Sequence, residues 1–176
     1  MSWYTINYQC GHEGDEQIYG PIKDRKEIAE RRGQKLCPDC YKEEVTKKRE
    51  VERLQATEKA QTQNLPELVG SEKQVAWAQT IRMKSLESVE KYMENRKPGV
   101  IKNADMPMAE QNIRWMKREC REFLEDKSLG EFFEIVTAGI DILRSQTSAS
   151  WWIDHRQADT AEEMIETALG LYIKTH

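Results

Sequence analysis

The stretches YQCGHEG (residues 8–14) and LCPDCYK (residues 36–42) decide how the first part of this chain folds. Each stretch holds two side chains that can bind a metal ion, separated by only one or two residues. Such a pair can bind one metal from a tight turn, and Gly11 permits the backbone conformation that the first turn needs. Three thiols and one imidazole form a donor set that zinc prefers. The sequence therefore predicts a structural zinc site with the ligands Cys10, His12, Cys37 and Cys40.

Two alternative roles for the same four side chains stay open. The thiols can be ordinary buried cysteines beside a histidine in a turn, or the Cys-x-x-Cys pair can take part in redox chemistry. Redox motifs of this kind occur next to βαβ units, whereas the residues around this pair predict a hairpin and a short helix. If zinc binds, four protein ligands leave no coordination position for a catalytic water.

The residues around the ligand pairs predict a small zinc-ribbon-like head, residues 1–43. Residues 3–9 alternate in character and are rich in aromatic and β-branched side chains, which is typical of a strand. A glycine-containing turn and a returning strand over residues 16–19 complete a β-hairpin. Asp24 is a candidate N-cap for a short helix over residues 25–33. A head of this size cannot bury a sufficient core, so we expect it to need the metal to fold.

The segment 44–64 predicts a long, charged linker helix. It contains no Gly or Pro, but its apolar positions form only a broken stripe, so most of its surface should be solvated. Cations along and beside it could follow a phosphate backbone, whereas the interleaved glutamates favour ordinary ion pairs between neighbouring turns. The candidate nucleic-acid contacts are Lys42, Lys47, Lys48, Arg49 and Arg53.

The remaining residues, 65–176, predict a bundle of four to five helices, which makes the protein mainly α-helical. Capping boxes mark three helix starts: Ser71 with Gln74, Ser128 with Glu131 and Thr160 with Glu163. We expect the first of these helices to end at Pro98. We expect another helix to begin near Pro107 and to run past Cys120, which is most simply a small core residue.

Composition excludes several classes of protein. No apolar run is long enough to span a membrane, and the N-terminus lacks the regions of a signal peptide, so we expect a cytoplasmic protein. The net charge of −4 comes from residues 65–176, because the first 64 residues carry equal numbers of acidic and basic side chains. Neither part is a strongly basic nucleic-acid binder by bulk charge.

Two stretches, residues 70–82 and 146–156, each place an arginine four or five residues after a tryptophan. Both residue types are over-represented at binding hot spots, and an arginine can lie over an indole ring. The candidate partner-binding residues are Trp77, Arg82, Trp152 and Arg156. Ordinary core tryptophans with surface arginines are the alternative. Because Trp151 and Trp152 are adjacent, they cannot both face one core from a helix, and at least one should be available to a partner.

The sequence favours a protein that is not an enzyme. Asp154 and His155 are the only candidate acid–base pair that we single out, yet adjacent residues on a helix point apart. An ordinary surface histidine is the simpler reading of His155. The chain also contains no Walker A loop, no GxGxxG and no HExxH motif.

The order of YTINYQCGHEG, CPDCYK, LPELVGSEKQVAWAQTIR and TSASWWIDHR resembles small proteins carried by plasmids, conjugative elements and phages of Gram-positive gut bacteria. The resemblance covers most of the chain and brings no catalytic motif with it. It implies a protein of a mobile element, and one role of such proteins is to block host defence. The chain is similar to anti-CRISPR proteins that inhibit Cas9.

These observations lead to two expectations about function. The first is a non-enzymatic inhibitor whose partner is a host protein or ribonucleoprotein complex, a Cas9-type effector. The alternative is a DNA- or RNA-binding accessory or regulatory protein of a mobile element, with the zinc ribbon as the reader. The broken apolar stripe of the linker helix and an exposed tryptophan would also suit a homodimer.

Overall fold

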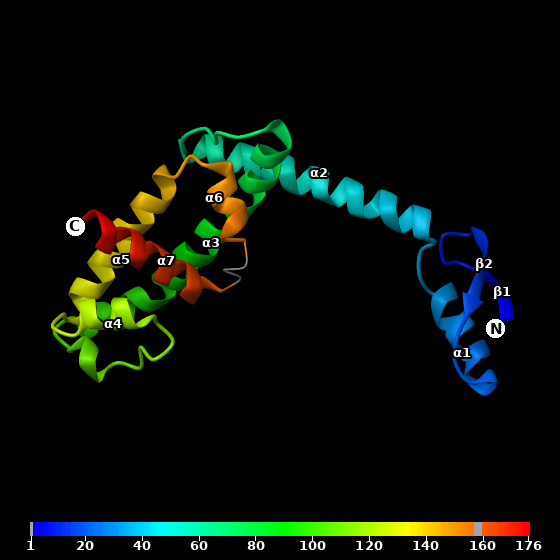
Figure 1. Cartoon of the computed structure of the whole chain (residues 1–176), viewed down its shortest axis with the longest axis horizontal. Coiled ribbons are helices and arrows are strands. Elements are labelled where there is room, and N and C mark those ends of the chain that lie inside the picture. Colours follow the sequence, from blue (N-terminus) through cyan, green and yellow to red (C-terminus); the bar gives the residue numbers. More distant parts are fainter. Residues whose placement is uncertain (1, 157–159) are drawn as a thin grey trace. The chain divides into compact units, whose positions relative to one another are not determined.

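The computed structural model describes residues 2–156 and 160–176, and it is mainly α-helical with an N-terminal hairpin (Figure 1). The elements are β1 (Ser2–Asn7), β2 (Glu13–Ile18), α1 (Ile22–Gly33), α2 (Pro38–Thr62), α3 (Glu72–Lys102), the 3-10 turn η1 (Met108–Glu110), α4 (Arg118–Leu124), α5 (Leu129–Ser145), α6 (Ala149–Asp154) and α7 (Ala161–Thr175). The predicted fold class is thereby confirmed. The chain forms two compact units, Met1–Glu52 and Arg53–His176, called here the first and second units.

In the first unit, β1 and β2 form an antiparallel hairpin in which Ser2 pairs with Ile18. Successive side chains of a strand point to opposite faces, so one face of the hairpin turns Ile6 and Ile18 inward. Both are buried, together with Tyr8 and Cys37, and side chains of α1 pack against them. This core is small, which agrees with the expectation that the head needs a metal ion to stabilise its fold.

The helix α1 begins at Ile22, earlier than predicted, and Asp24 is not its N-cap. Pro21 occupies the cap position without a side-chain hydrogen bond, because its fixed backbone already suits the entry to a helix. Asp24 instead lies in the first turn, where its charge favours the helix N-terminus. At the other end, a Cβ on Gly33 would lie 2.8 Å from the carbonyl oxygen of Asn7, so only glycine permits this close approach to β1.

The linker helix is longer than predicted and belongs to both units. It begins at Pro38, a residue that suits the first helical turn because its missing N–H would have no partner there. The two units divide within α2, whereas the sequence placed a boundary near Leu65. The last turns of α2 join the second unit because two buried alanines pack beside Met83 of α3. These are Ala56 and Ala60.

The second unit is a helical bundle built around one main core and a smaller one. The main core is formed by buried side chains of α3, α5, α6 and α7, among them Leu86, Val89, Val136, Leu143, Trp152, Met164 and Ile165. A Cβ on Gly139 of α5 would lie 2.6 Å from the carbonyl oxygen of Ala168 on α7, so these helices touch nearly backbone to backbone. The smaller core lies around α4 and includes Met108, Met116, Cys120, Leu124 and Leu169.

All three predicted capping boxes are confirmed. The hydroxyls of Ser71, Ser128 and Thr160 accept a hydrogen bond from the backbone N–H three residues later, and the Gln or Glu side chain there bonds back to the cap. They open α3, α5 and α7. These boxes satisfy N–H groups that a helix N-terminus leaves without partners, which explains why they mark helix starts so well.

Two predicted helix boundaries are wrong. The helix α3 continues through Pro98 to Lys102. Glu94 and Pro98 are both exposed, so water can bond to the carbonyl that Pro98 leaves without a donor. The predicted helix after Pro107 is only a 3-10 turn, a loop and the short α4.

Among residues 2–156 and 160–176, no helix combines the length and the apolar character that crossing a membrane would require.

Candidate metal centre

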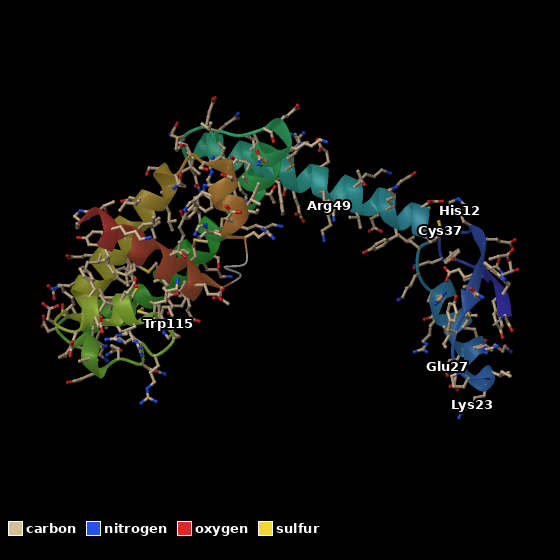
Figure 2. All side chains as sticks on the ribbon, in the orientation of Figure 1. His12, Lys23, Glu27, Cys37, Arg49 and Trp115 are labelled. Atoms are coloured by element: carbon tan, nitrogen blue, oxygen red, sulfur yellow. The ribbon has the colours of Figure 1, made fainter. Side chains whose placement is uncertain are left out.

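The four predicted metal ligands come together where the hairpin meets the start of α2; Figure 2 labels His12 and Cys37 there. Their ligand atoms all lie within 4.8 Å of one another. Nδ1 of His12 lies 3.4 Å from Sγ of Cys37 and 3.3 Å from Sγ of Cys40. A tetrahedral zinc ion with ordinary Zn–S and Zn–N bonds holds its sulfur and nitrogen ligands about 3.6 Å apart. The cluster therefore has the size of a tetrahedral metal site.

The local backbone explains why these side chains converge. Gly11 has a φ of 81°, the left-handed conformation that glycine adopts without strain. The N–H of Tyr8 donates to the carbonyl of His12 at 2.9 Å, which closes the first turn. The N–H of Gln9 donates to the carbonyl of Lys35 at 3.0 Å and ties this turn to the segment that carries the second pair. The expected role of Gly11 is confirmed.

Backbone donors also point at the sulfur atoms. The N–H of Cys37 lies 3.3 Å from Sγ of Cys10, and the N–H of Cys40 lies 3.4 Å from Sγ of Cys37. The bond from Cys37 is the main reason why the pKa of Cys10 falls to about 6. The pKa of Cys40 rises to about 12, chiefly because of its hydrogen bond with Cys37. A divalent cation would stabilise the three thiolates together, so the donor set fits a structural metal site and matches the preferences of zinc.

A groove of about 640 Å³ lies on the first unit, and we call it the head groove. It is lined by Tyr8, Glu16, Arg32, Lys35, Leu36, Pro38 and Tyr41. The carboxylate of Glu16 accepts hydrogen bonds from the hydroxyl of Tyr8 and the guanidinium of Arg32. The bond from Tyr8 is the main cause of the lowered pKa of Glu16, and the same bond raises the pKa of Tyr8 to about 12. Because Arg32 compensates Glu16, the head groove keeps the positive charge of Lys35.

The sequence did not single out the head groove. Only Tyr8 could have been found from a local pattern. It follows Tyr4 and Ile6 at intervals of two residues, so its side chain is predicted to lie on the same face of the strand, towards α1. The approach of Arg32 and Tyr41 depends on the fold, because they come from α1 and α2.

The candidate nucleic-acid contacts lie along α2, where Figure 2 labels Arg49. The side chains of Lys42, Lys47, Lys48 and Arg49 are exposed, and Arg53 is partly buried. Nζ of Lys47 lies 3.7 Å from a carboxylate oxygen of Glu43, one turn earlier. This pair agrees with the alternative of a solvated, ion-paired helix, and such exposed pairs contribute little to stability.

The structure separates the four candidate partner-binding residues into two classes. Trp77 is 52% exposed, and the guanidinium of Arg156 lies 5.6 Å from its ring centroid. Arg82 and Trp152 are buried, with 1% and 0% exposure, so neither presents its side chain at the surface of this structure. Trp152 donates from Nε1 to the carbonyl of Gln146 at 3.1 Å and is part of the main core.

The residues proposed as an acid–base pair do not face each other. Nδ1 of His155 lies 2.8 Å from the carbonyl of Trp151, and the two rings stack at a centroid distance of 3.9 Å. The side chain of Asp154 is exposed. Cys120 is buried in the smaller core, as predicted for a structural cysteine.

Comparisons of the chain with models of protein families, with curated proteins and with solved structures find no match.

Proposed function

We propose that the protein is a non-enzymatic interaction protein of a mobile genetic element, which binds and inhibits a host nucleic-acid-targeting complex of the Cas9 type. The resemblance of its motifs to proteins of plasmids, conjugative elements and phages supports the first part of this proposal. The similarity to anti-CRISPR proteins supports the second part.

The exposed pair of Trp77 and Arg156 is the observation that carries the proposal. A half-exposed tryptophan with a guanidinium over its ring combines the two residue types that are enriched at the centres of protein interfaces. The ring sits on α3, and Arg156 lies two residues after the end of α6, where its Nη1 and its backbone N–H donate to the carbonyl of Ile153. Such prior ordering reduces the entropy that binding would cost.

In this proposal, zinc fastens the head and takes no part in chemistry. Four protein ligands leave no coordination position for water or substrate, which is typical of structural zinc. The metal then holds the hairpin against α1 and the start of α2 so that the head can present its surface.

The test is inhibition of DNA cleavage by a Cas9 from a Gram-positive host, with the purified full chain. We expect Trp77→Ala and Arg156→Ala each to weaken inhibition by about 30-fold or more, as for a hot-spot residue. Trp115→Ala is the matched control, because Trp115 is 40% exposed on the loop before α4 and should leave inhibition unchanged. Failure of the unaltered protein to copurify with Cas9 or to reduce cleavage would exclude this function.

Direct nucleic-acid binding is a second candidate function, and the head groove favours it. Tyr41 is 62% exposed and lies in the same groove as Lys35, so a base could stack on the ring while the cation contacts a phosphate. We expect binding of single-stranded DNA or RNA to weaken steeply with salt, with a slope that falls by about 0.7 when Lys35→Gln removes one phosphate contact. Absence of any shift at low salt in a gel-mobility assay would eliminate this candidate.

A further inference from the structure

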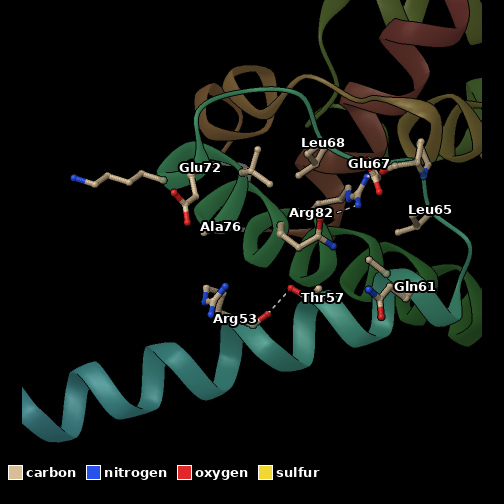
Figure 3. A pocket seen from close by; sticks show the side chains of 14 residues that line it. Arg53, Thr57, Gln61, Leu65, Glu67, Leu68, Glu72, Ala76 and Arg82 are labelled. Carbon is tan, nitrogen blue, oxygen red and sulfur yellow. Dashed lines mark hydrogen bonds between the residues drawn. The ribbon is translucent and has the colours of Figure 1, made fainter.

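A pocket of about 740 Å³ opens in the second unit between the last turns of α2, the segment 65–68 and the start of α3 (Figure 3). Its apolar lining is provided by Ala60, Leu65, Pro66, Leu68, Val75 and Ala76. Its cationic residues are Arg53, Lys73 and Arg82, and its acidic residues are Glu67 and Glu72. Three cationic and two acidic side chains give the lining a formal excess of one positive charge.

Arg82 is the unusual member of this lining, because it is 1% exposed and still carries a charge. Its Nη1 donates to the carbonyl of Pro66 and its Nη2 to Oε1 of Gln79, both at 2.8 Å. Its Nε has no hydrogen-bond partner among the residues that the structure describes. Across residues 2–156 and 160–176, no carboxylate forms an ion pair with it, and burial lowers its pKa. Both of its acceptors are neutral oxygens.

A purely structural role does not account for this charge. A buried cation without a counter-charge strongly destabilises a fold, and a buried donor without an acceptor adds to that cost. Tying the segment 65–68 to α3 needs only neutral donors. The neighbouring segment is already held from its other side, since the N–H of Val69 donates to the carbonyl of Thr147 at 2.7 Å. The positive charge of Arg82 therefore calls for an anion that the described part of the chain does not supply.

We propose that this pocket binds a monocarboxylate with an apolar body, whose carboxylate pairs with Arg82. A planar guanidinium matches a carboxylate through two parallel hydrogen bonds, and Arg82 uses only two of its five N–H groups within the chain. The single excess charge matches one carboxylate, whereas Glu67 and Glu72 would repel a dianion. The apolar lining suits a hydrocarbon body, and the volume lies in the range of small-ligand sites.

The ligand reaches Arg82 by displacing a side chain. The Nε atom is covered in the present arrangement, and Leu68 and Arg82 both line the pocket shown in Figure 3. Leu68 is only partly buried and belongs to the loop between α2 and α3, so a change of its rotamer opens the way. This proposal is independent of Cas9 inhibition, and the carboxylate can belong to a free acid or to the C-terminus of a peptide.

The test titrates the full chain with hexanoate and, separately, with hexanamide, which has nearly the same shape without the charge. We expect saturable binding of hexanoate by calorimetry, and a higher unfolding temperature of the helical bundle in its presence. Hexanamide should bind at least tenfold more weakly. A short peptide ending in leucine, with a free or an amidated C-terminus, identifies a peptide source. Failure of both hexanoate and the free peptide to bind overturns the proposal.

Two variants locate the site. Arg82→Met removes the charge at similar length, and Ala76→Leu fills the pocket while Arg82 stays in place. Each should weaken the binding of the carboxylate at least tenfold. Arg96→Met is the control, because Arg96 is an exposed arginine over the ring of Tyr92 and does not line this pocket. If Arg82→Met fails to fold, Ala76→Leu decides: unchanged binding in that variant places the ligand elsewhere and overturns the proposal.

Discussion

Replacing Cys37 with serine is expected to unfold the hairpin and α1 while the helices of the second unit stay folded. Structural zinc sites in small peptides contribute about 10–16 kcal/mol of apparent binding energy, which is their folding energy. The core of the first unit contains only a few buried apolar side chains, so it cannot replace that contribution. A heteronuclear NMR spectrum should show the amides of β1, β2 and α1 collapse to unfolded positions, with those of α3 to α7 unchanged. A dye assay should find about one zinc per native chain and none in the variant.

Cys120→Ala is the matched control for this experiment. Cys120 is also a buried cysteine, but it lies in the smaller core of the second unit and is not one of the four ligands. The control should keep one zinc per chain and an intact head, with a modest loss of stability in the second unit. If chelation of zinc unfolded the whole chain, the head would not be an independently folding unit. If Cys37→Ser left the hairpin folded, the metal would not be needed to stabilise the head.

The metal ligands could be predicted from the sequence because their chemistry is local. Cys10 and His12 are joined by one glycine, and Cys37 and Cys40 by two residues, so each pair is set by its own turn. The head groove depends instead on side chains of three separate elements, whose approach is a property of the folded unit. No spacing of residues in the sequence predicts the head groove.

The three helix starts that carry capping boxes followed from the sequence for the same reason, whereas the end of α3 and the start of the helix after Pro107 did not. A capping box acts within four residues. In contrast, the segment after Pro107 is held by long-range bonds, such as the one from the N–H of Met108 to the carbonyl of Lys127 at 2.8 Å. Met116 is buried from a loop, whereas Cys120 and Leu124 are buried from the short α4. Periodicity predicted the burial of these residues but not the backbone that achieves it.

Arg82 shows a second limit of sequence patterns. Its position, four residues from both Ala78 and Leu86, lies on the apolar face of the helix, but its charge favours the surface because burying a charge is unfavourable. The structure buries Arg82 all the same, in the lining of a pocket. Departures of this kind mark positions where function can outweigh stability.

Trp152→Ala is the second change with a large expected effect, and it acts on the second unit. The side chain is fully buried, its indole N–H is bonded to the carbonyl of Gln146, and its ring meets that of Trp151 at a centroid distance of 5.1 Å. Truncating such a side chain leaves a large cavity and costs about 3–5 kcal/mol. For a unit of this size, the unfolding temperature should fall by roughly 10–20 °C, measured by circular dichroism at 222 nm.

Trp77→Ala separates this structural effect from binding, since both changes remove an indole from the same unit. Trp77 is 52% exposed, so its removal leaves no cavity and should alter the stability by less than about 1 kcal/mol. The two tryptophans were grouped by their spacing to an arginine, yet burial gives them opposite roles. Trp152→Ala should lower the stability of the second unit, and Trp77→Ala should keep the stability and lose the partner. Equal losses of stability in the two variants would contradict this assignment, because burial would then not decide which tryptophan stabilises the bundle.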